Sequence, residues 1–392
     1  MTSLRALHVA SFNGNIGDNA NHNGFRRKLM NSLECDIEFE EVEMREFYQS
    51  WNIRDFNSDE FINLCNSFDL VIIGGGNFFE LKWDYSYTGT TINISNESLD
   101  KINTPILFHA LGCDIAKGAS QSTISKFDKF LEKVTNSEKY FVSLRNDGSY
   151  NTVTKLYGDK YNEKVYRAPD GAFFLESKKF NFPELNSNLK SVGINIVSDM
   201  TDIRFNTQTT EDINYEEFLD GFANVVNDFL ENHSHYQIIL FPHIFSDLNA
   251  IYKLMERIND KFRRTRIVTA PCLTGKGSEE YIFGLYKECE FILGMRFHSN
   301  VCSIAQGIPT IGLSSYKKIH DLYSELDILD RLVYVNKKGF ENKLYTEIEY
   351  LINNLELVKD RYKKVNEVIE TEGNQFYNKI KKWFHGVTSN ES

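Results

Sequence analysis

Positive charge is scarce in this chain of 392 residues. Lysine and arginine together number 44 against 55 aspartate and glutamate residues, which gives a formal net charge of −11 with neutral histidines. Because an acidic protein repels a phosphate backbone, we expect no nucleic-acid partner. Any site for an anion must therefore be built locally, from a few basic side chains that the fold brings together.

Long hydrophobic runs and paired cysteines are missing as well. No apolar stretch reaches the length of a membrane span, and the N-terminal stretch lacks the apolar segment of a signal peptide. We therefore expect a cytoplasmic protein, with at most a peripheral contact at the inner face of the membrane through its basic KIKKWFH end. The six cysteines form no C-x-x-C pair, so we expect free thiols, most of them buried, and neither a disulfide framework nor a zinc site.

The rest of the sequence indicates a folded α/β protein. Hydrophobic residues make up 41% of the chain and prolines number only 6, which argues against a disordered protein. Short apolar runs typical of buried parallel strands recur at 5–12, 69–76, 105–112, 140–145, 191–197, 236–242, 265–270, 290–296 and 308–314. Amphipathic stretches typical of helices lie between them, at 120–137, 215–232, 247–260, 278–288 and 299–306.

A polar stretch without periodicity, residues 176–190, separates two such series, and we interpret it as a linker. The pattern predicts two Rossmann-like domains facing each other across a cleft, a GT-B-like α/β arrangement. The predicted domains are 1–180 and 190–340, followed by a C-terminal helical segment, 341–392, that packs back on the protein. An apolar stripe supports this last helix, and Gly373 is its expected weak point.

Candidate site residues of the first domain follow its strands, because α/β proteins place chemistry at the carboxyl ends of strands. The NIGDN stretch contains Asn15 and Asp18, and Asp18 is either a helix N-cap or a group that acts on substrate. Asn77 and Phe78 follow three glycines and suit a sugar ring, which needs an apolar face and hydrogen-bonding partners. The aromatic residues after them fit sugar contact or coverage of the domain edge: Trp83, Tyr85 and Tyr87.

Two further residues of this domain lie near strand ends. His109 is either a core residue or a ligand for a sugar. Arg145 is followed by a turn that opens a helix, so its guanidinium group is expected at the carboxyl edge of the sheet. It is either an anion ligand or one half of a surface salt bridge.

The second domain contains the densest group of basic residues. The stretch EFILGMRFHSN places Arg296 and His298 directly after a buried strand, with Ser299 at the start of the next helix. A small anion at this point would meet a guanidinium group, an imidazole and helix N-terminal amides. The SSYKK stretch returns Lys317 to the same edge, and His243 follows another strand.

These motifs resemble the polysaccharide pyruvyl transferase family. The resemblance rests on G-M-R-F-H-S-N followed by G-I-P-T-I and Y-K-K, on NIGDN, VIIGGGNFF, ALGCDI, SLRNDGS, APDGAFFL and PHIFSD, all in family order up to about Lys318. Members of that family resemble inverting GT-B glycosyltransferases in architecture. They transfer the enolpyruvyl group of phosphoenolpyruvate to two hydroxyls of a sugar, which forms a cyclic ketal and releases phosphate.

The resemblance implies roles for the residues named above. His298 would be the catalytic acid or acid/base, with Arg296 and Asp18 completing the catalytic set. Phosphoenolpyruvate, the co-substrate, would be bound mainly by the second domain, at Arg145, Arg296, Phe297, His298, Ser299 and Lys317. The acceptor, a sugar or a lipid-linked oligosaccharide, would be bound mainly by the first domain, at Asn15, Asn77, Phe78, His109 and His243. No metal and no cofactor is expected.

The chain departs from the family pattern where Asn146 separates Arg145 from Asp147, and where the bulky Phe297 separates Arg296 from His298. Two other functions stay open. A GT-B glycosyltransferase that uses a nucleotide sugar would also need basic groups at a helix N-terminus. A non-catalytic carbohydrate-binding protein would explain the aromatic loops. The identity of the acceptor sugar, the hydroxyls bridged, the ketal stereochemistry and the oligomeric state do not follow from the sequence.

Overall fold

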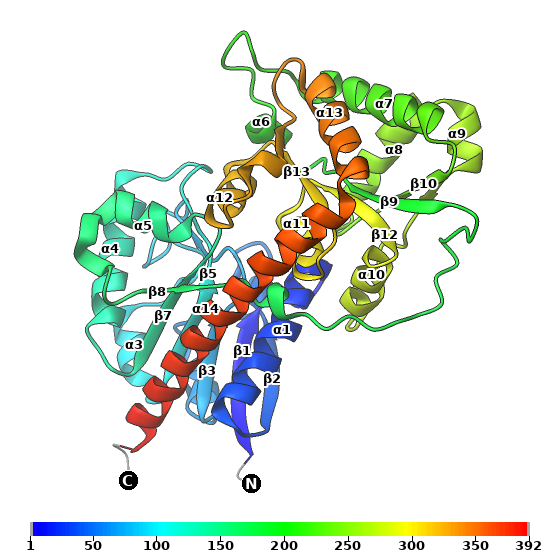
Figure 1. Ribbon diagram of the computed structural model, residues 1–392. Helices are drawn as coiled ribbons and strands as arrows, with labels where there is room; N and C mark the ends of the chain where they lie inside the picture. Colours follow the sequence, from blue (N-terminus) through cyan, green and yellow to red (C-terminus); the bar gives the residue numbers. More distant parts are fainter. Residues whose placement is uncertain (1–2, 390–392) are drawn as a thin grey trace. The chain divides into compact units, whose positions relative to one another are not determined.

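The computed structural model describes residues 3–389, which form two units, each built on its own parallel sheet (Figure 1). The first unit comprises residues 3–12, 21–174 and 369–389, and the second comprises 13–20 and 175–368. Residues 13–20 therefore group with the second unit although they follow the first strand of the first one. This exchange places Asn15 and Asp18 in the same unit as Arg296 and His298.

The sheet of the first unit has six parallel strands in the order β2-β1-β3-β5-β7-β8. Their bounds are β1 Leu4–Ala10, β2 Ile37–Glu43, β3 Leu70–Gly74, β5 Ile106–Leu111, β7 Tyr140–Arg145 and β8 Tyr166–Ala168. A two-stranded ladder joins β4 Phe79–Glu80 to β6 Cys113–Asp114. The helices that follow these strands are α1 Ile16–Leu33, α2 Asp59–Cys65, α3 Asn96–Lys101, α4 Gln121–Thr135 and α5 Ser149–Tyr157. The first residues of α1 belong to the second unit.

Burial of apolar residues explains these elements. Every residue of β3, β5 and β7 is buried, as expected for central parallel strands covered on both faces. The predicted face of α4 packs into the core through Phe127, Phe130, Leu131 and Val134. Burial of each such side chain contributes about 1.5–3 kcal/mol to stability.

The second unit repeats the arrangement with the strand order β11-β10-β9-β12-β13-β14. Its strands are β9 Lys190–Asn195, β10 Tyr236–Leu240, β11 Ile267–Thr269, β12 Cys289–Gly294, β13 Thr310–Ser314 and β14 Leu332–Tyr334. Its helices are α6 Thr201–Arg204, α7 Tyr215–Asn232, α8 Asp247–Arg257, α9 Asp260–Thr265, α10 Ser278–Tyr286, α11 Phe297–Ala305, α12 Lys317–Glu325 and α13 Phe340–Asn353. The predicted helix 247–260 is thus two helices, because Ile258 has an extended backbone.

The C-terminal part of the chain is helical, as predicted, and ends in the long helix α14 Leu355–Ser389. Helix α14 continues without a break through Gly373, where the sequence predicts a weak point. A Cβ atom on Gly373 would lie 2.4 Å from Cζ of Phe174, so the glycine allows the helix to pack tightly on that ring. Packing against Phe174 requires a small residue at position 373, and this requirement outweighs the low helix propensity of glycine.

Three other features can be compared with the sequence. Residues 175–189 contain no helix or strand, in agreement with an irregular segment there, and they group with the second unit. All six cysteines are free thiols, and Cys65, Cys113, Cys289 and Cys302 are buried. Among the helices that the structure describes, none combines the length and the apolar character needed to cross a membrane.

Candidate active site

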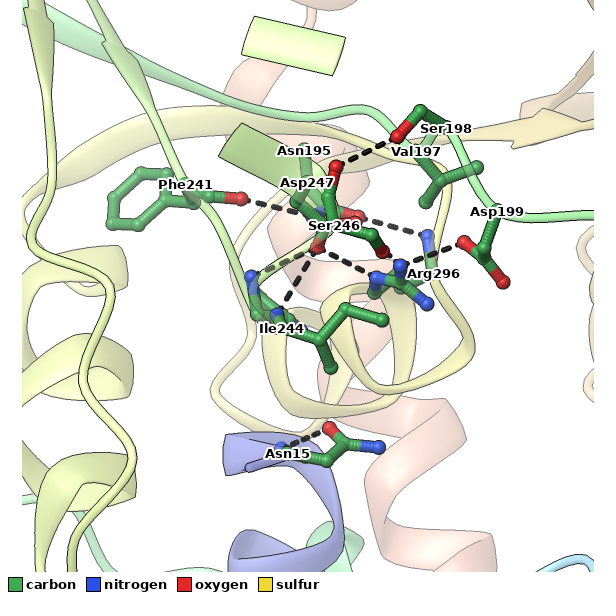
Figure 2. Close-up of polar contacts among 12 residues, drawn as sticks. Asn15, Asn195, Val197, Ser198, Asp199, Phe241, Ile244, Ser246, Asp247 and Arg296 are labelled. Carbon is green, nitrogen blue, oxygen red and sulfur yellow. Dashed lines mark hydrogen bonds and ion pairs between the residues drawn. The ribbon is translucent and has the colours of Figure 1, made fainter. Parts of the chain in front are cut away.

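The strand ends of the second unit are joined through Asn195, the last residue of β9. Its amide Nδ2 donates to the carbonyl of Phe241 at 2.9 Å, and its Oδ1 accepts from the backbone N–H of Arg296 at 2.9 Å (Figure 2). Arg296 has an extended backbone and stands at the N-cap position of α11, directly after β12. The buried asparagine therefore fixes where the Arg296 backbone leaves the sheet.

Two carboxylates hold the guanidinium group of Arg296 (Figure 2). Nε donates to Oδ2 of Asp247 at 2.7 Å, and Nη2 donates to both Oδ1 of Asp247 and Oδ1 of Asp199, the latter at 2.7 Å. The Asp247 side chain is fully buried, whereas that of Asp199 is 29% exposed. Arg296 thus makes a two-pronged contact with an inner carboxylate and a second contact with an outer, solvent-accessible one.

Asp247 is fixed by the start of its own helix. Its Oδ2 accepts the backbone N–H groups of His243 at 2.9 Å and Ile244 at 3.3 Å, besides the guanidinium of Arg296. Next to it, the Ser198 hydroxyl donates to the carbonyl of Ser246 at 2.6 Å (Figure 2). The loop between β10 and α8 is therefore held firmly against the loop that follows β9.

Arg204 adds a second guanidinium group to this cluster. Its Nη2 lies 3.8 Å from Oδ2 of Asp199, its Nη1 donates to the Ser315 hydroxyl at 3.4 Å, and its charge lies 5.4 Å from the ring of Tyr316. Burial raises the pKa of Asp199, but the charges of Arg296 and Arg204 lower it more, so the net shift is downward. Asp199 therefore stays ionised between two arginines.

His298 lies in the first turn of α11, which begins two residues earlier than the sequence suggests. Its Nδ1 is 4.0 Å from Oδ1 of Asp18, and the His298 side chain is 8% exposed. Asn15 donates from Nδ2 to Oδ2 of Asp18 at 3.0 Å. Its Oδ1 accepts from the backbone N–H of Gly17 at 3.0 Å, which is the contact drawn at Asn15 in Figure 2. Asn15 thus orients the carboxylate that faces the imidazole.

Gly17 makes the approach of His298 possible. A Cβ atom at this position would lie 2.5 Å from Nδ1 of His298, which is closer than real Cβ contacts. Helix α1 begins at Ile16, so Asp18 lies in its first turn and is not the N-cap. The side chain of Asn15 bonds to the start of this helix instead, and the expected sugar contact of Asn15 stays a prediction.

His243 does not occupy the exposed position expected of a sugar ligand. It is 1% exposed, and its Nε2 lies 2.8 Å from the hydroxyl of Tyr286. Burial lowers its pKa well below the usual range, and Arg296 and His298 lower it further. The ring is therefore a neutral packing group beneath the cluster. Among residues 3–389, no set of His, Cys, Asp and Glu side chains is arranged to hold a metal ion.

The other predicted ligands of this unit differ in position. Ser299 is buried and its hydroxyl donates to the carbonyl of Arg296 at 2.8 Å, so it stabilises the start of α11. The ring of Phe297 lies edge-on to His298, with centroids 5.3 Å apart. The side chain of Lys317 is 66% exposed and pairs with Asp321 on its own helix. Of the Tyr-Lys-Lys stretch, Tyr316 is the residue that contacts the arginine cluster, through Arg204.

Arg145 in the first unit is paired within a buried network. Its Nη2 lies 2.8 Å from Oδ2 of Asp147, and its Nη1 lies 3.3 Å from Oδ2 of Asp170. The alternative of a surface salt bridge was therefore wrong, since the pair is buried. A Cβ atom on Gly112 would lie 2.6 Å from Oδ1 of Asn77 and 3.2 Å from Nη2 of Arg145. The roles of Arg145 and Asn77 in binding substrate stay predictions.

Phe78 and His109 belong to the interior of the first unit, and their expected contact with sugar stays a prediction. Phe78 is 4% exposed and is part of the hydrophobic core. His109 is fully buried and stacks on Phe25 with ring centroids 3.8 Å apart. Burial is the main cause that lowers the pKa of His109 to about 3.

Sequence reasoning missed Asp199 and Arg204 altogether. The stretch DMTDIR that contains them has no motif, and their role appears only when the fold brings them to Arg296, about 100 residues away. Asp247 did carry a signal, because it opens a helix directly after a strand in PHIFSD. Its contact with Arg296 nevertheless depends on two strands that are distant in sequence.

Comparison with known proteins agrees with this architecture. The model of the family described as polysaccharide pyruvyl transferase matches residues 5–316. No curated protein matches the chain. A protein assigned as UDP-N-acetylglucosamine 2-epimerase from Listeria monocytogenes has a similar structure, with 11% identity, coverage of 97% of this chain and 94% of that one, and a TM-score of 0.54.

MnaA of S. aureus, solved together with UDP, is similar at 11% identity, with coverage of 92% and 90% and a TM-score of 0.51. At such low identity these structures inform the fold alone, which is the GT-B type with two parallel-sheet units. The family match covers most of the chain, including Asp18, Arg296 and His298. The chain belongs to the polysaccharide pyruvyl transferase family.

Proposed function

We propose that the protein transfers the enolpyruvyl group of phosphoenolpyruvate to two hydroxyls of a sugar in a cell-surface polysaccharide or its precursor. C3 of the enol gains a proton, and both hydroxyl oxygens form bonds to C2. The bond from C2 to the phosphate oxygen breaks, and phosphate leaves with the second hydroxyl proton. The product is a cyclic pyruvate ketal. The reaction is redox-neutral and needs no cofactor.

The observation that carries this proposal is the Asp18–His298 pair beside Arg296 within one unit. Protonation of C3 requires a general acid, and an imidazolium is the usual acid of proteins near neutral pH. A carboxylate within about 4–6 Å stabilises the charged imidazole electrostatically. Asp18 has this position, and Asn15 holds it there.

Binding of the anionic donor is assigned to the two arginines. The two positive charges of Arg296 and Arg204 are balanced by the two negative charges of Asp199 and Asp247. With all four side chains in place, the cluster therefore attracts an anion only weakly. Asp199 is the exposed member and lies between the two guanidinium groups. We infer that the phosphate or carboxylate of phosphoenolpyruvate displaces Asp199, while buried Asp247 keeps Arg296 in place.

The proposal is tested by incubating the purified protein with phosphoenolpyruvate and a panel of galactosides, glucosides and N-acetylmannosaminides. Phosphate release and product mass are measured together. Acceptor-dependent release with the mass gain of a pyruvyl group, lost in Arg296→Ala and His298→Ala, supports it. If a folded protein releases no phosphate but is thermally stabilised by UDP, the proposal is wrong and a nucleotide-sugar glycosyltransferase takes its place.

A further inference from the structure

Two loops of the first unit bring aromatic side chains together. The ring of Tyr48 lies 6.3 Å from that of Trp83, and Trp83 makes an edge contact with Tyr85 at 5.7 Å between centroids. Tyr85 is 43% exposed, and Tyr87 on the same loop is 63% exposed. We call Tyr48, Trp83, Tyr85 and Tyr87 the aromatic surface.

The aromatic surface is placed by the sheet. Tyr48 follows β2 and the short helix Met44–Phe47, while the other three residues follow β3 and β4. Strands β2 and β3 both pair in parallel with β1, so the two loops leave the same edge of the sheet. This carboxyl edge is where open α/β sheets bind ligands.

The loop that carries most of the surface is ordered by its own hydrogen bonds. The backbone N–H of Ser86 donates to the carbonyl of Trp83 at 2.9 Å, and that of Tyr87 donates to Oδ1 of Asn93 at 2.9 Å. Gly89 sits tightly on α4, because a Cβ atom there would lie 2.5 Å from the carbonyl of Thr123. A ligand therefore finds the rings already in position, and binding does not have to order the loop.

The chemistry of the surface fits a glycan better than a lipid. The exposed rings of Tyr85 and Tyr87 offer flat apolar faces with a polar hydroxyl edge, which match the C–H faces and hydroxyls of sugar rings. Lys82 lies 4.6 Å from the Trp83 ring and 3.1 Å from Oε2 of Glu80, which offsets its charge. An anionic membrane is attracted by clusters of lysine and arginine whose charge is not offset in this way.

We propose that the aromatic surface binds sugar residues of the acceptor chain other than the one that is modified. The protein then prefers an oligosaccharide to the corresponding monosaccharide. That these sugars belong to the acceptor rests on the proposed function, but the binding itself does not.

Binding is measured by titrating the full chain, without phosphoenolpyruvate, with β-linked galactose, glucose and N-acetylmannosamine oligomers of one to about four residues. We expect affinity to rise with chain length for one of the three series. In Tyr85→Ala and Tyr87→Ala, the increase in affinity from the monosaccharide to the longest oligomer should be about tenfold smaller. Tyr252→Ala, at a tyrosine of the second unit that is 63% exposed, should leave it unchanged. Far-UV circular dichroism checks that each variant is folded.

Affinity that does not rise with length in the wild type, or a gain that survives in both variants, overturns the proposal. Aromatic-dependent binding to phosphatidylglycerol vesicles in place of glycans overturns it too. Glycan binding by a protein that releases no phosphate supports this inference while refuting the proposed transfer. Phosphate release without any preference for longer chains supports the proposed transfer and refutes this inference. The two failures can therefore be told apart.

Discussion

Asp18 and His298 come from helices α1 and α11, which are far apart in the sequence, and Oδ1 of Asp18 lies 4.0 Å from Nδ1 of His298. Residues 13–20 leave the first unit's sequence and group with the second, which brings this carboxylate to α11. Gly17 has no side chain, and a Cβ atom there would lie 2.5 Å from Nδ1 of His298. The pair therefore depends on the glycine of the NIGDN motif and on the fold that brings residues 13–20 to α11.

Replacing Asp18 tests the pair directly. Asp18→Asn removes the negative charge that stabilises the imidazolium, and we expect kcat to fall by about tenfold to 100-fold. The KM for phosphoenolpyruvate should change less than kcat, because Asp18 faces His298, whereas donor binding is assigned to Arg296 and Arg204. Steady-state kinetics measure both values. Asp228→Asn, at an exposed position on α7, is the matched control and should behave as the wild type.

Asp199 is expected to compete with the substrate for Arg296. Asp199→Asn removes the internal anion, so the KM for phosphoenolpyruvate should fall by about tenfold, which corresponds to about 1.4 kcal/mol. Asp202→Asn, an exposed change on α6, is the control. A KM that rises in Asp199→Asn would show that Asp199 positions Arg296 and does not stand in for the substrate.

Gly17 should not tolerate a side chain. In Gly17→Ala the new Cβ would clash with the His298 ring, and displacement of the ring by about 1 Å should lower kcat/KM by about 100-fold. Gly17 is buried in the first turn of α1, so overpacking there should also cost about 1–3 kcal/mol of stability. Gly275→Ala is the control, because no atom lies within 4 Å of its Cβ position. Equal activity of the two variants would contradict the close packing of Gly17 and His298.

Acid should destabilise the first unit through its buried histidines. Burial lowers the pKa of His109 to about 3, against about 6.5 in the unfolded chain, and it also lowers that of His8. Below about pH 6.5 the unfolded chain binds protons that the folded one does not, so the free energy of unfolding falls as pH falls. Each such histidine contributes a slope of about 1.4 kcal/mol per pH unit.

Chemical denaturation between pH 7 and pH 5 measures this slope. His109→Phe keeps an aromatic ring against Phe25 but cannot be protonated, so its stability should depend less on pH than that of the wild type. Identical slopes for the two proteins would mean that His109 is protonated in the folded state.

Much of the fold follows from the sequence, because apolar runs and helical stripes report burial directly. The α7 bounds agree with the prediction to the residue, and the central strands agree within a few residues. Strand β2 was missed, since its sequence IEFEEVE is mostly charged and it lies at the edge of the sheet, where few of its residues are buried. Edge strands carry little of the hydrophobic signal that identifies central ones.

The site was predictable only in part. Arg296 and His298 were visible because they follow a buried strand and open a helix. The carboxylates that hold Arg296 could not be identified in the same way, because a single sequence does not show which distant charged residues form pairs. The burial of Phe78 and His109 was not predictable for a related reason: residues after a strand can turn back into the core as well as outward, and the side chain's direction is decided by its neighbours.

Carrying out the reaction in D2O tests the central claim most directly. If His298 protonates C3 of phosphoenolpyruvate, the methyl group of the ketal must carry one deuterium that does not exchange, which mass spectrometry and proton NMR of the product detect. We predict a CH2D group with the wild type and no product with His298→Ala. A sugar product that retains the intact CH2= group, or one whose methyl group carries no deuterium, would contradict the account.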